Sequence, residues 1–134
     1  MRLAVLANPD SWYVRDLERA AAGFADGCRI ETVSFTDLRS RLGGASIEVH
    51  SGEIDLARDA DAVLVRTMPL GSLEQVVFRM DALGQLHAAG KLVVNSPRAI
   101  EAAVDKYLAS ARLQAAGPPT PRTTAFYTPA GAEA

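Results

Sequence analysis

The chain has 134 residues, of which 49% are hydrophobic, and a formal net charge of -2 at pH 7, so it can bury one core but carries no broad basic field. This charge argues against nucleic acid as a main partner. No apolar run is long enough to span a membrane, and the first one stops at residues 8–10, which argues against a signal peptide. The sequence therefore predicts a cytoplasmic protein.

A buried strand is the first element that the sequence predicts. Residues 2–8 form a near-continuous apolar run that ends in a turn signal, which is typical of a strand covered on both faces. Residues 11–24 follow with the spacing of an amphipathic helix, and its apolar stripe is predicted to include Trp12, Leu17 and residues 20–24. The chain is therefore expected to begin with a strand, a turn and a helix.

The next segment is predicted to hold one more core strand and two smaller elements. Residues 28–35 read as a strand, and Thr36 is placed to cap a short helix over residues 36–42 that the following glycines would stop. Apolar and polar residues alternate weakly over residues 47–54. This pattern favours a small exposed hairpin over a core element.

Residues 61–66 form the clearest buried strand, and a long helix is predicted after the loop that follows it. Ser72 and Gln75 have the spacing of a capping box, so the helix should begin there and end near Gly90. The residues expected on its apolar face are Leu73, Val76, Val77, Met80 and Leu83. The residues expected on its solvent face are Glu74, Arg79, Asp81 and Gln85.

A fourth strand, at residues 91–95, precedes two further helices. Ser96 and Pro97 have the order of a cap and a first-turn proline, because proline lacks only an N–H that would be unpaired there. Asp105 is placed to cap the next helix, which should run to Ala116.

A proline-rich stretch at residues 117–121 predicts a domain boundary. Its glycine can end a helix and its prolines prevent the helix from resuming. We therefore expect an α/β domain at residues 1–117, followed at residues 118–134 by a linker and the start of a second domain. Residues 122–127 read as a strand of that second domain.

Alternating strands and helices predict a doubly wound α/β fold, with an open parallel, Rossmann-like sheet that has helices on both faces. Ligands of such sheets bind beyond the carboxyl ends of the strands. Arg66 ends the third strand, and Asn95 and Ser96 follow the fourth. A guanidinium there can hold a carboxylate or phosphate, although by position alone a surface salt bridge explains Arg66 at least as well. By the same local reasoning, Lys106 is a solvated surface residue.

Several chemistries have no support in the sequence. His50 and His87 stand apart without further ligands near them, so surface or packing roles are favoured and no metal site is predicted. Glycine-rich fingerprints for dinucleotides or nucleotide phosphates are missing, as is the serine-hydrolase motif. No catalytic residue is assigned within the chain.

Three ordered motifs do indicate a family. The stretches DAVLVRTMPLGSLEQ, FRMDAL and AAGKLVVNSPRAIEAAVDKYLASARLQAAGPPTPRT occupy residues 61–75, 78–83 and 88–123. Together they resemble the N-terminal, pre-ATP-grasp domain of RimK-like ATP-grasp ligases, the group that includes glutathione synthetase and tetrahydromethanopterin glutamate ligase. The V-N-S-P, D-K and proline-rich elements are the most specific, whereas residues 1–60 match only as a general α/β lead-in.

The resemblance implies a parent enzyme that uses ATP and Mg²⁺ to join a carboxylate to an amine, with glutamate as a common substrate. It assigns Lys106 to an ATP phosphate, Arg66 to the acceptor side of the cleft, and Asn95 and Ser96 to the turn that shapes the cleft. The Mg²⁺ ligands and the second ATP lysine of the family are expected after residue 134. We therefore expect the chain alone to be inactive, and the parent to be a homo-oligomer.

A different class of function stays open at this point. The chain could be a free-standing, non-catalytic α/β module that binds a ligand or a protein beside Arg66. That hypothesis predicts a natural end near Ala134. Thr128 and Pro129 repeat the cap-and-proline signal with no helix after them, which favours the ligase hypothesis. The sequence does not choose among pterin, peptide and thiol-containing acceptors.

Overall fold

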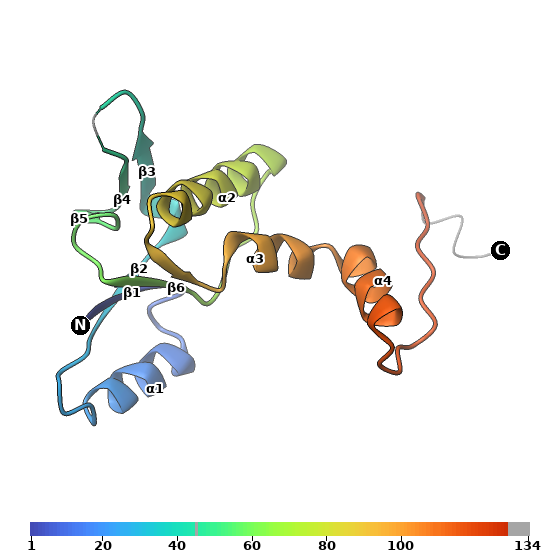
Figure 1. Cartoon of the computed structure of the whole chain (residues 1–134), viewed down its shortest axis with the longest axis horizontal. Coiled ribbons are helices and arrows are strands. Elements are labelled where there is room, and N and C mark those ends of the chain that lie inside the picture. The colour runs from blue at the N-terminus through green and yellow to red at the C-terminus, as the bar shows by residue number, and fades with distance from the viewer. Residues whose placement is uncertain (45, 129–134) are drawn as a thin grey trace. The chain divides into compact units, whose positions relative to one another are not determined.

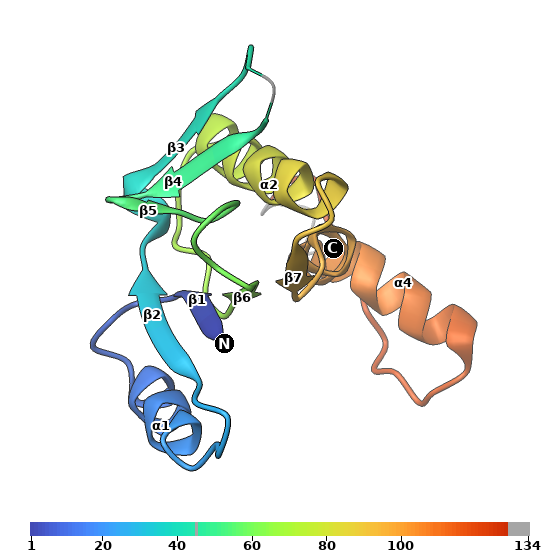
Figure 2. The ribbon, with the colours of Figure 1, turned by 60° about the vertical axis from the view of Figure 1, so that its left-hand side comes forward.

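The computed structural model describes residues 1–44 and 46–128, shown from two directions in Figures 1 and 2. It groups the chain into two compact units, Met1–Pro97 and Arg98–Ala134. We describe each unit by itself. The domain boundary expected at residue 117 stays a prediction.

A four-stranded parallel sheet forms the centre of the first unit. Its strands lie in the order β2 (Arg29–Val33), β1 (Arg2–Leu6), β6 (Ala62–Val65) and β7 (Leu92–Val94). The helices α1 and α2 lie on opposite faces of this sheet (Figure 1). All four strands and the α/β fold class are as predicted. The nearly continuous apolar runs of β1 and β6 suit strands that are covered on both faces.

Helix α1 (Trp12–Ala21) is shorter than predicted, and its apolar stripe differs. Val14 and Ala21 are buried and Leu17 is half-buried against the sheet. Trp12 is 67% exposed because it stands at the first turn, and Phe24 lies beyond the end of the helix and is also exposed. The prediction that Trp12 and Phe24 face the core was wrong.

The prediction of a short helix at residues 36–42 was also wrong. A single 3₁₀ turn, η1 (Phe35–Asp37), is capped by the Ser34 side chain, and the chain then extends as β3 (Leu38–Arg41). This strand pairs antiparallel with β4 (Glu48–Ser51), which pairs with β5 (Ile54–Asp55), so the three form a second sheet (Figure 2). Cross-strand pairing decided the conformation here, not local helix signals.

The hairpin expected at residues 47–54 exists as β4 and β5, but it is not an exposed element. Val49 and the neighbouring Leu56 are fully buried, and Ser51 and Asp55 are nearly so. The Ser51 hydroxyl donates to the Ser34 carbonyl at 2.8 Å and accepts from the Ser34 amide at 3.1 Å. These bonds satisfy the buried serine and join the second sheet to the end of β2.

Helix α2 (Leu73–Ala88) begins as predicted. The Gln75 amide donates to the Ser72 hydroxyl and the Ser72 amide donates to the Gln75 side chain, which completes the capping box. Gly90 follows the helix with a positive φ of 83°. The buried face is rotated from the predicted one and consists of Arg79, Ala82, Leu83 and Leu86, whereas Leu73 and Val77 are exposed.

Arg79 corrects the prediction that placed it on the solvent face, because it is only 6% exposed. Its guanidinium donates to the Pro69 carbonyl at 2.7 Å and lies 5.9 Å from the centre of the Phe35 ring. No carboxylate among the described residues pairs with it. A carbonyl and an aromatic face therefore take the place of a counter-ion for this buried cation.

The second unit contains α3, whose first residue closes the first unit, and α4. Helix α3 (Pro97–Val104) begins at the predicted proline, and α4 (Lys106–Ala116) is capped by Asp105, which accepts from the Leu108 amide at 2.9 Å. Residues 122–127 form no strand, so that prediction was wrong, and Pro129 lies outside the described residues. None of the helices described is long and apolar enough to cross a membrane.

Replacing Arg79 with alanine should lower the free energy of unfolding by about 2 kcal/mol or more, because it leaves a cavity and an unpaired Pro69 carbonyl. Urea denaturation would measure the loss. The matched control is Asp81→Ala on the exposed face of the same helix, which should change the unfolding free energy by less than about 0.5 kcal/mol. Equal effects of the two substitutions would contradict a structural role for Arg79.

Candidate functional site

The carboxyl ends of β1 and β6 lie where the strand order reverses. From β1 the chain goes to β2 on one side, and later returns to β6 and β7 on the other. Connections leave such a point in opposite directions, and ligands of open α/β sheets bind in the crevice expected there. We call this place between the loops after β1 and β6 the crevice, and Arg66 and Thr67 follow β6 directly.

Hydrogen bonds fix the strand ends beside the crevice. The Leu6 carbonyl accepts from the amides of Arg66, at 3.0 Å, and of Thr67, at 3.2 Å. The Asn95 side-chain amide donates to the Val65 carbonyl at 3.3 Å. The structure thus brings Arg66 and Asn95, which are far apart in sequence, to one edge of the sheet, and Ser96 follows Asn95 directly.

Tyr13 on α1 was missed by the sequence analysis and contacts both residues at the end of β6. The Arg66 guanidinium carbon lies 4.4 Å from the centre of the Tyr13 ring, and the Tyr13 hydroxyl is 2.5 Å from the Thr67 hydroxyl. The bond with Thr67, followed by one with Ser11, lowers the pKa of Tyr13, and the charge of Arg66 acts in the same direction. Among the described residues, Arg66 has an aromatic neighbour and forms none of the salt bridges, although its position alone had suggested one.

The turn after β1 explains why Tyr13 reaches the crevice. The Asn8 side chain accepts from the Asp10 amide at 3.1 Å, and the Asn8 carbonyl accepts from both the amide and the hydroxyl of Ser11. These bonds start α1 at Trp12, which sets Tyr13 in its first turn. Asn8 therefore forms the turn, and Tyr13 supplies the side chain beside Arg66.

The loop at residues 67–71 follows β6 at the crevice and is hydrogen-bonded to a side chain of α2. Arg79 on that helix binds the Pro69 carbonyl. A Cβ atom at Gly71 would lie 2.7 Å from the Gln75 side-chain oxygen and 3.0 Å from the Arg79 guanidinium. A larger residue at position 71 would therefore displace the ends of the Gln75 and Arg79 side chains, and Gln75 belongs to the cap of α2.

Lys106 belongs to the second unit, whereas Arg66 belongs to the first, so the two residues are described separately. It is the first residue of α4, and its exposed ammonium donates to the Ala103 carbonyl at 2.8 Å. A solvent-facing ammonium held by one carbonyl can exchange that partner for a stronger acceptor. Its role toward ATP stays a prediction, as do the substrate roles of Arg66, Asn95 and Ser96.

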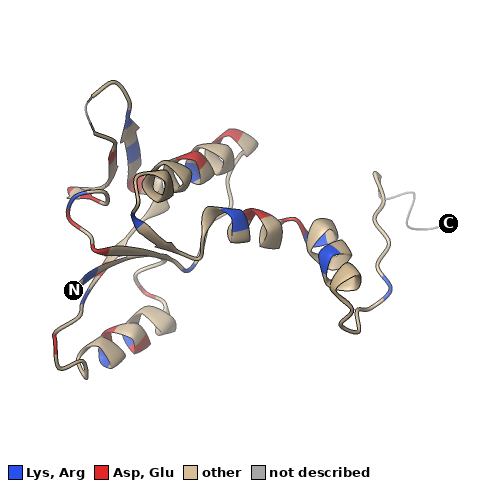
Figure 3. Cartoon of the chain, viewed as in Figure 1, with Lys and Arg blue, Asp and Glu red and all other residues tan. Residues whose placement is uncertain are grey.

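The remaining ionisable residues form neither a broad single-sign surface nor a metal cluster. Acidic and basic residues are interspersed on α1 and α2 (Figure 3). Among residues 1–44 and 46–128, no group of three or more histidine, cysteine, aspartate or glutamate residues could hold a metal ion.

Comparisons with known proteins agree with the motifs. No protein-family model matches the chain. It is 38% identical over 122 residues to the tetrahydromethanopterin:alpha-L-glutamate ligase of Methanosarcina acetivorans, a match that covers 90% of this chain and 37% of that enzyme. The chain thus spans less than half the length of this curated relative.

Solved structures add the fold. The ATP-grasp ligase PsnB, in complex with a minimal precursor, Mg and ADP, superposes with a TM-score of 0.63 at 25% identity, over 90% of this chain and 44% of PsnB. The macrocyclase MdnC of Microcystis aeruginosa, bound to its precursor peptide MdnA, gives a TM-score of 0.61 over 98% of this chain and 48% of MdnC. Its 16% identity supports the fold alone.

The sheet and these likenesses point to one class of protein: the chain is similar to part of ATP-grasp ligases, in agreement with the resemblance that the motifs indicated. Within that class, the Methanosarcina glutamate ligase is a relative whose sequence matches nearly the whole of this chain. Activity and substrates belong to the whole proteins, so for this chain they are proposals.

The Thr67→Val substitution should raise the pKa of Tyr13 toward its ordinary value, because it removes the largest cause of the lowered pKa. A pH titration of tyrosinate absorbance, with the exposed Tyr107 and Tyr127 both replaced by phenylalanine, would measure it. Thr124→Val in the other unit is the control and should leave the titration unchanged. An unshifted Tyr13 titration in Thr67→Val would contradict the hydrogen bond.

Proposed function

We propose that this chain is the N-terminal, substrate-side part of an ATP-dependent carboxylate–amine ligase. The observation that carries the proposal is Arg66. It stands at the crevice with its guanidinium on Tyr13 and no carboxylate partner among the described residues, in a chain related to a glutamate ligase. A guanidinium that rests on an aromatic ring and has no carboxylate partner at a ligand crevice suits an anionic substrate.

The chemistry assigned to Arg66 is the binding of a carboxylate. A guanidinium has five N–H donors in one plane, and contact of its face with Tyr13 leaves the donors at its edge able to form two parallel bonds to a carboxylate. The ring also restricts the side chain before the substrate arrives, which reduces the entropy lost on binding. Asn95 acts by position, because its bond to the Val65 carbonyl holds the V-N-S-P turn beside β6.

The proposed reaction has two steps. The terminal phosphoryl group of ATP passes to an oxygen of the bound carboxylate, which gives an acyl phosphate and ADP. The amine nitrogen of the second substrate then attacks the acyl carbon, the bond to the phosphate oxygen breaks, and phosphate leaves as the nitrogen loses a proton. Arg66 orients the carboxylate in this scheme, so that the reacting atoms begin in a productive geometry.

Lys106 is proposed to bind an ATP phosphate. Its exposed ammonium would leave the Ala103 carbonyl for phosphate oxygens, where it neutralises part of their charge. When bound, Mg²⁺ would draw charge from the transferred phosphoryl group. The described residues contain no cluster for it, and the proposal gives this chain no part in holding the metal.

Glutamate is the proposed amine substrate, which the name of the Methanosarcina relative supports. The acceptor is proposed to be a carboxylate-bearing small molecule or peptide. A pterin acceptor follows the name of that relative, whereas the precursor complexes of PsnB and MdnC support a peptide.

The isolated 134-residue chain should release no ADP from ATP above the buffer background, with or without glutamate. The physical reason is that the groups proposed here bind substrates, and none of them activates the phosphoryl group. A coupled ADP assay measures this. ADP release that disappears in Lys106→Ala would refute the proposal that catalysis needs further domains.

In a protein that carries this sequence together with the ATP-grasp domains, two substitutions should affect different substrates. Arg66→Lys keeps the charge but loses the planar fork, so KM for the acceptor carboxylate should rise about tenfold while KM for ATP stays unchanged. Lys106→Ala should raise KM for ATP by about tenfold or more. Steady-state kinetics with each substrate varied in turn separates the two effects.

The matched controls for this pair are Arg29→Lys at the opposite end of the sheet and Arg112→Ala on the exposed surface of α4. Both should leave the two KM values unchanged. Unaltered kinetics in Arg66→Lys would remove the assigned role of Arg66. Unaltered kinetics in Lys106→Ala would remove that of Lys106.

A further inference from the structure

The second sheet has one polar face that the proposed ligase function does not use. The register of its strands places Arg39 opposite His50, Arg41 opposite Glu48, and His50 opposite Asp55. Alternate residues of a strand share a face, so these side chains gather on one side of the sheet. Of the intervening residues, Leu38, Val49 and Ser51 are buried, whereas Ser40 is exposed and reaches the rim of the hollow described next.

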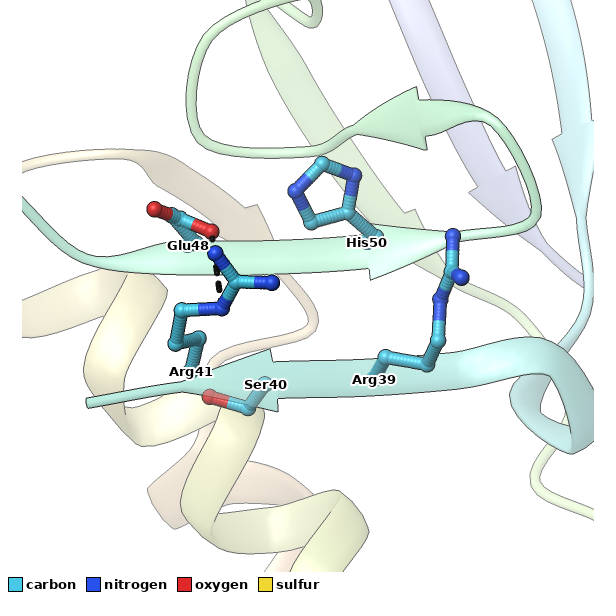
Figure 4. Close-up of a pocket in the computed structure, with 5 residues that line it drawn as sticks. All are labelled: Arg39, Ser40, Arg41, Glu48 and His50. Carbon is cyan, nitrogen blue, oxygen red and sulfur yellow. Dashed lines mark ion pairs between the residues drawn. The ribbon is translucent and has the colours of Figure 1, made fainter.

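A cavity of about 310 Å³ opens on this face and is lined by Arg39, Ser40, Arg41, Glu48 and His50. The arginines come from β3, and Glu48 and His50 come from β4 (Figure 4). We call these five residues the β3–β4 pocket. Its volume lies at the lower end of the range for small-ligand sites.

Both guanidiniums of the pocket keep N–H donors that are not used in the hydrogen bond of Arg39 or the ion pair of Arg41. Arg39 donates to the Gly52 carbonyl at 2.5 Å, which anchors its side chain without neutralising it. Arg41 lies 3.6 Å from Glu48, and both side chains are more than a third exposed. A solvated ion pair of this kind contributes little and can yield to a second anion. The pocket therefore presents two cations with weak competition from one carboxylate.

A buried carboxylate, Asp55, lies next to the pocket residue His50. One oxygen of Asp55 accepts from the amides of Ala57, at 3.0 Å, and Arg58, at 3.3 Å, which accounts for its burial. Its other oxygen lies 3.9 Å from the imidazole of His50, whose side chain is 28% exposed. This distance is too long for a hydrogen bond, so Asp55 lies near the imidazole without fixing its orientation.

We propose that the β3–β4 pocket binds a small dianion, a dicarboxylate or a phosphate, between Arg39 and Arg41. The two arginines are two residues apart on one strand face, a separation of about 7 Å, so one dicarboxylate can meet both. Charged residues on a strand at the edge of a sheet can also serve only to prevent aggregation. That role needs no cavity beside the arginines.

The test is an NMR titration of the ¹⁵N-labelled 134-residue chain with glutarate, inorganic phosphate and acetate at constant ionic strength. Glutarate or phosphate should give saturable shifts confined to residues 39–41 and 48–52, with an affinity at least about tenfold tighter than that of acetate, because acetate can engage only one arginine. The measurement contains no ATP, so its outcome is separate from that of the ligase proposal.

Substitutions sharpen this test. Arg39→Gln and Arg41→Gln should each weaken glutarate binding about tenfold or more, whereas Glu48→Gln should tighten it, because the competing carboxylate is removed. Arg19→Gln is the matched control, since Arg19 also pairs with a carboxylate on the surface, Asp16, but lies on α1. Each spectrum also reports whether the variant is folded.

Two outcomes would overturn the proposal. One is chemical shift changes that do not saturate or that occur equally at all surface arginines. The other is glutarate binding that is unchanged in both Arg39→Gln and Arg41→Gln.

A second titration, with a peptide, identifies the source of the carboxylates. A short Glu-Ala-Glu peptide that binds at least about tenfold tighter than glutarate would assign the pocket to an acidic peptide segment. Equal or weaker peptide binding would assign it to a free small anion, and either result supports a dianion pocket.

Discussion

The Leu6 carbonyl is the point on which the crevice depends, because it accepts two successive amides, those of Arg66 and Thr67. A single acceptor thereby ends β6 against β1 and turns the chain toward residues 67–71. Arg66 leaves the sheet at a defined place as a result, and Tyr13 can receive its guanidinium. These are main-chain bonds, so this geometry does not depend on which side chains occupy positions 6 and 67.

The central sheet could be predicted from the sequence because β1, β6 and β7 are nearly continuous apolar runs, which are typical of strands in a parallel sheet. The exception is β2, which carries Arg29 and Glu31. The capping box at Ser72, the first-turn proline Pro97 and the cap at Asp105 were equally predictable, since they depend on neighbours within one turn. The residues after Phe35 were not. Their strand exists through pairing with β4, a contact that local spacing does not reveal.

Some residues of the candidate site could likewise be predicted from the sequence, and others could not. Arg66, Asn95 and Ser96 could be selected because strand ends meet at one edge of a parallel sheet. Tyr13 could not, since a tyrosine in a first helical turn gives no signal until the turn at Asn8 is seen to aim it. Arg79 was misassigned because charge favours solvent. Yet it occupies the first position of the spacing 79, 82, 83, 86 that defines the buried stripe.

Trp12 is a fluorescent residue beside the crevice. It is the single tryptophan of the chain, it is largely exposed, and its ring centre lies 5.8 Å from that of Tyr13 in an edge-on arrangement. The indole therefore senses the same ring that carries the Arg66 guanidinium. Light emitted by this one residue reports on the state of the crevice without any label, so events at the strand ends can be followed in real time on unmodified protein.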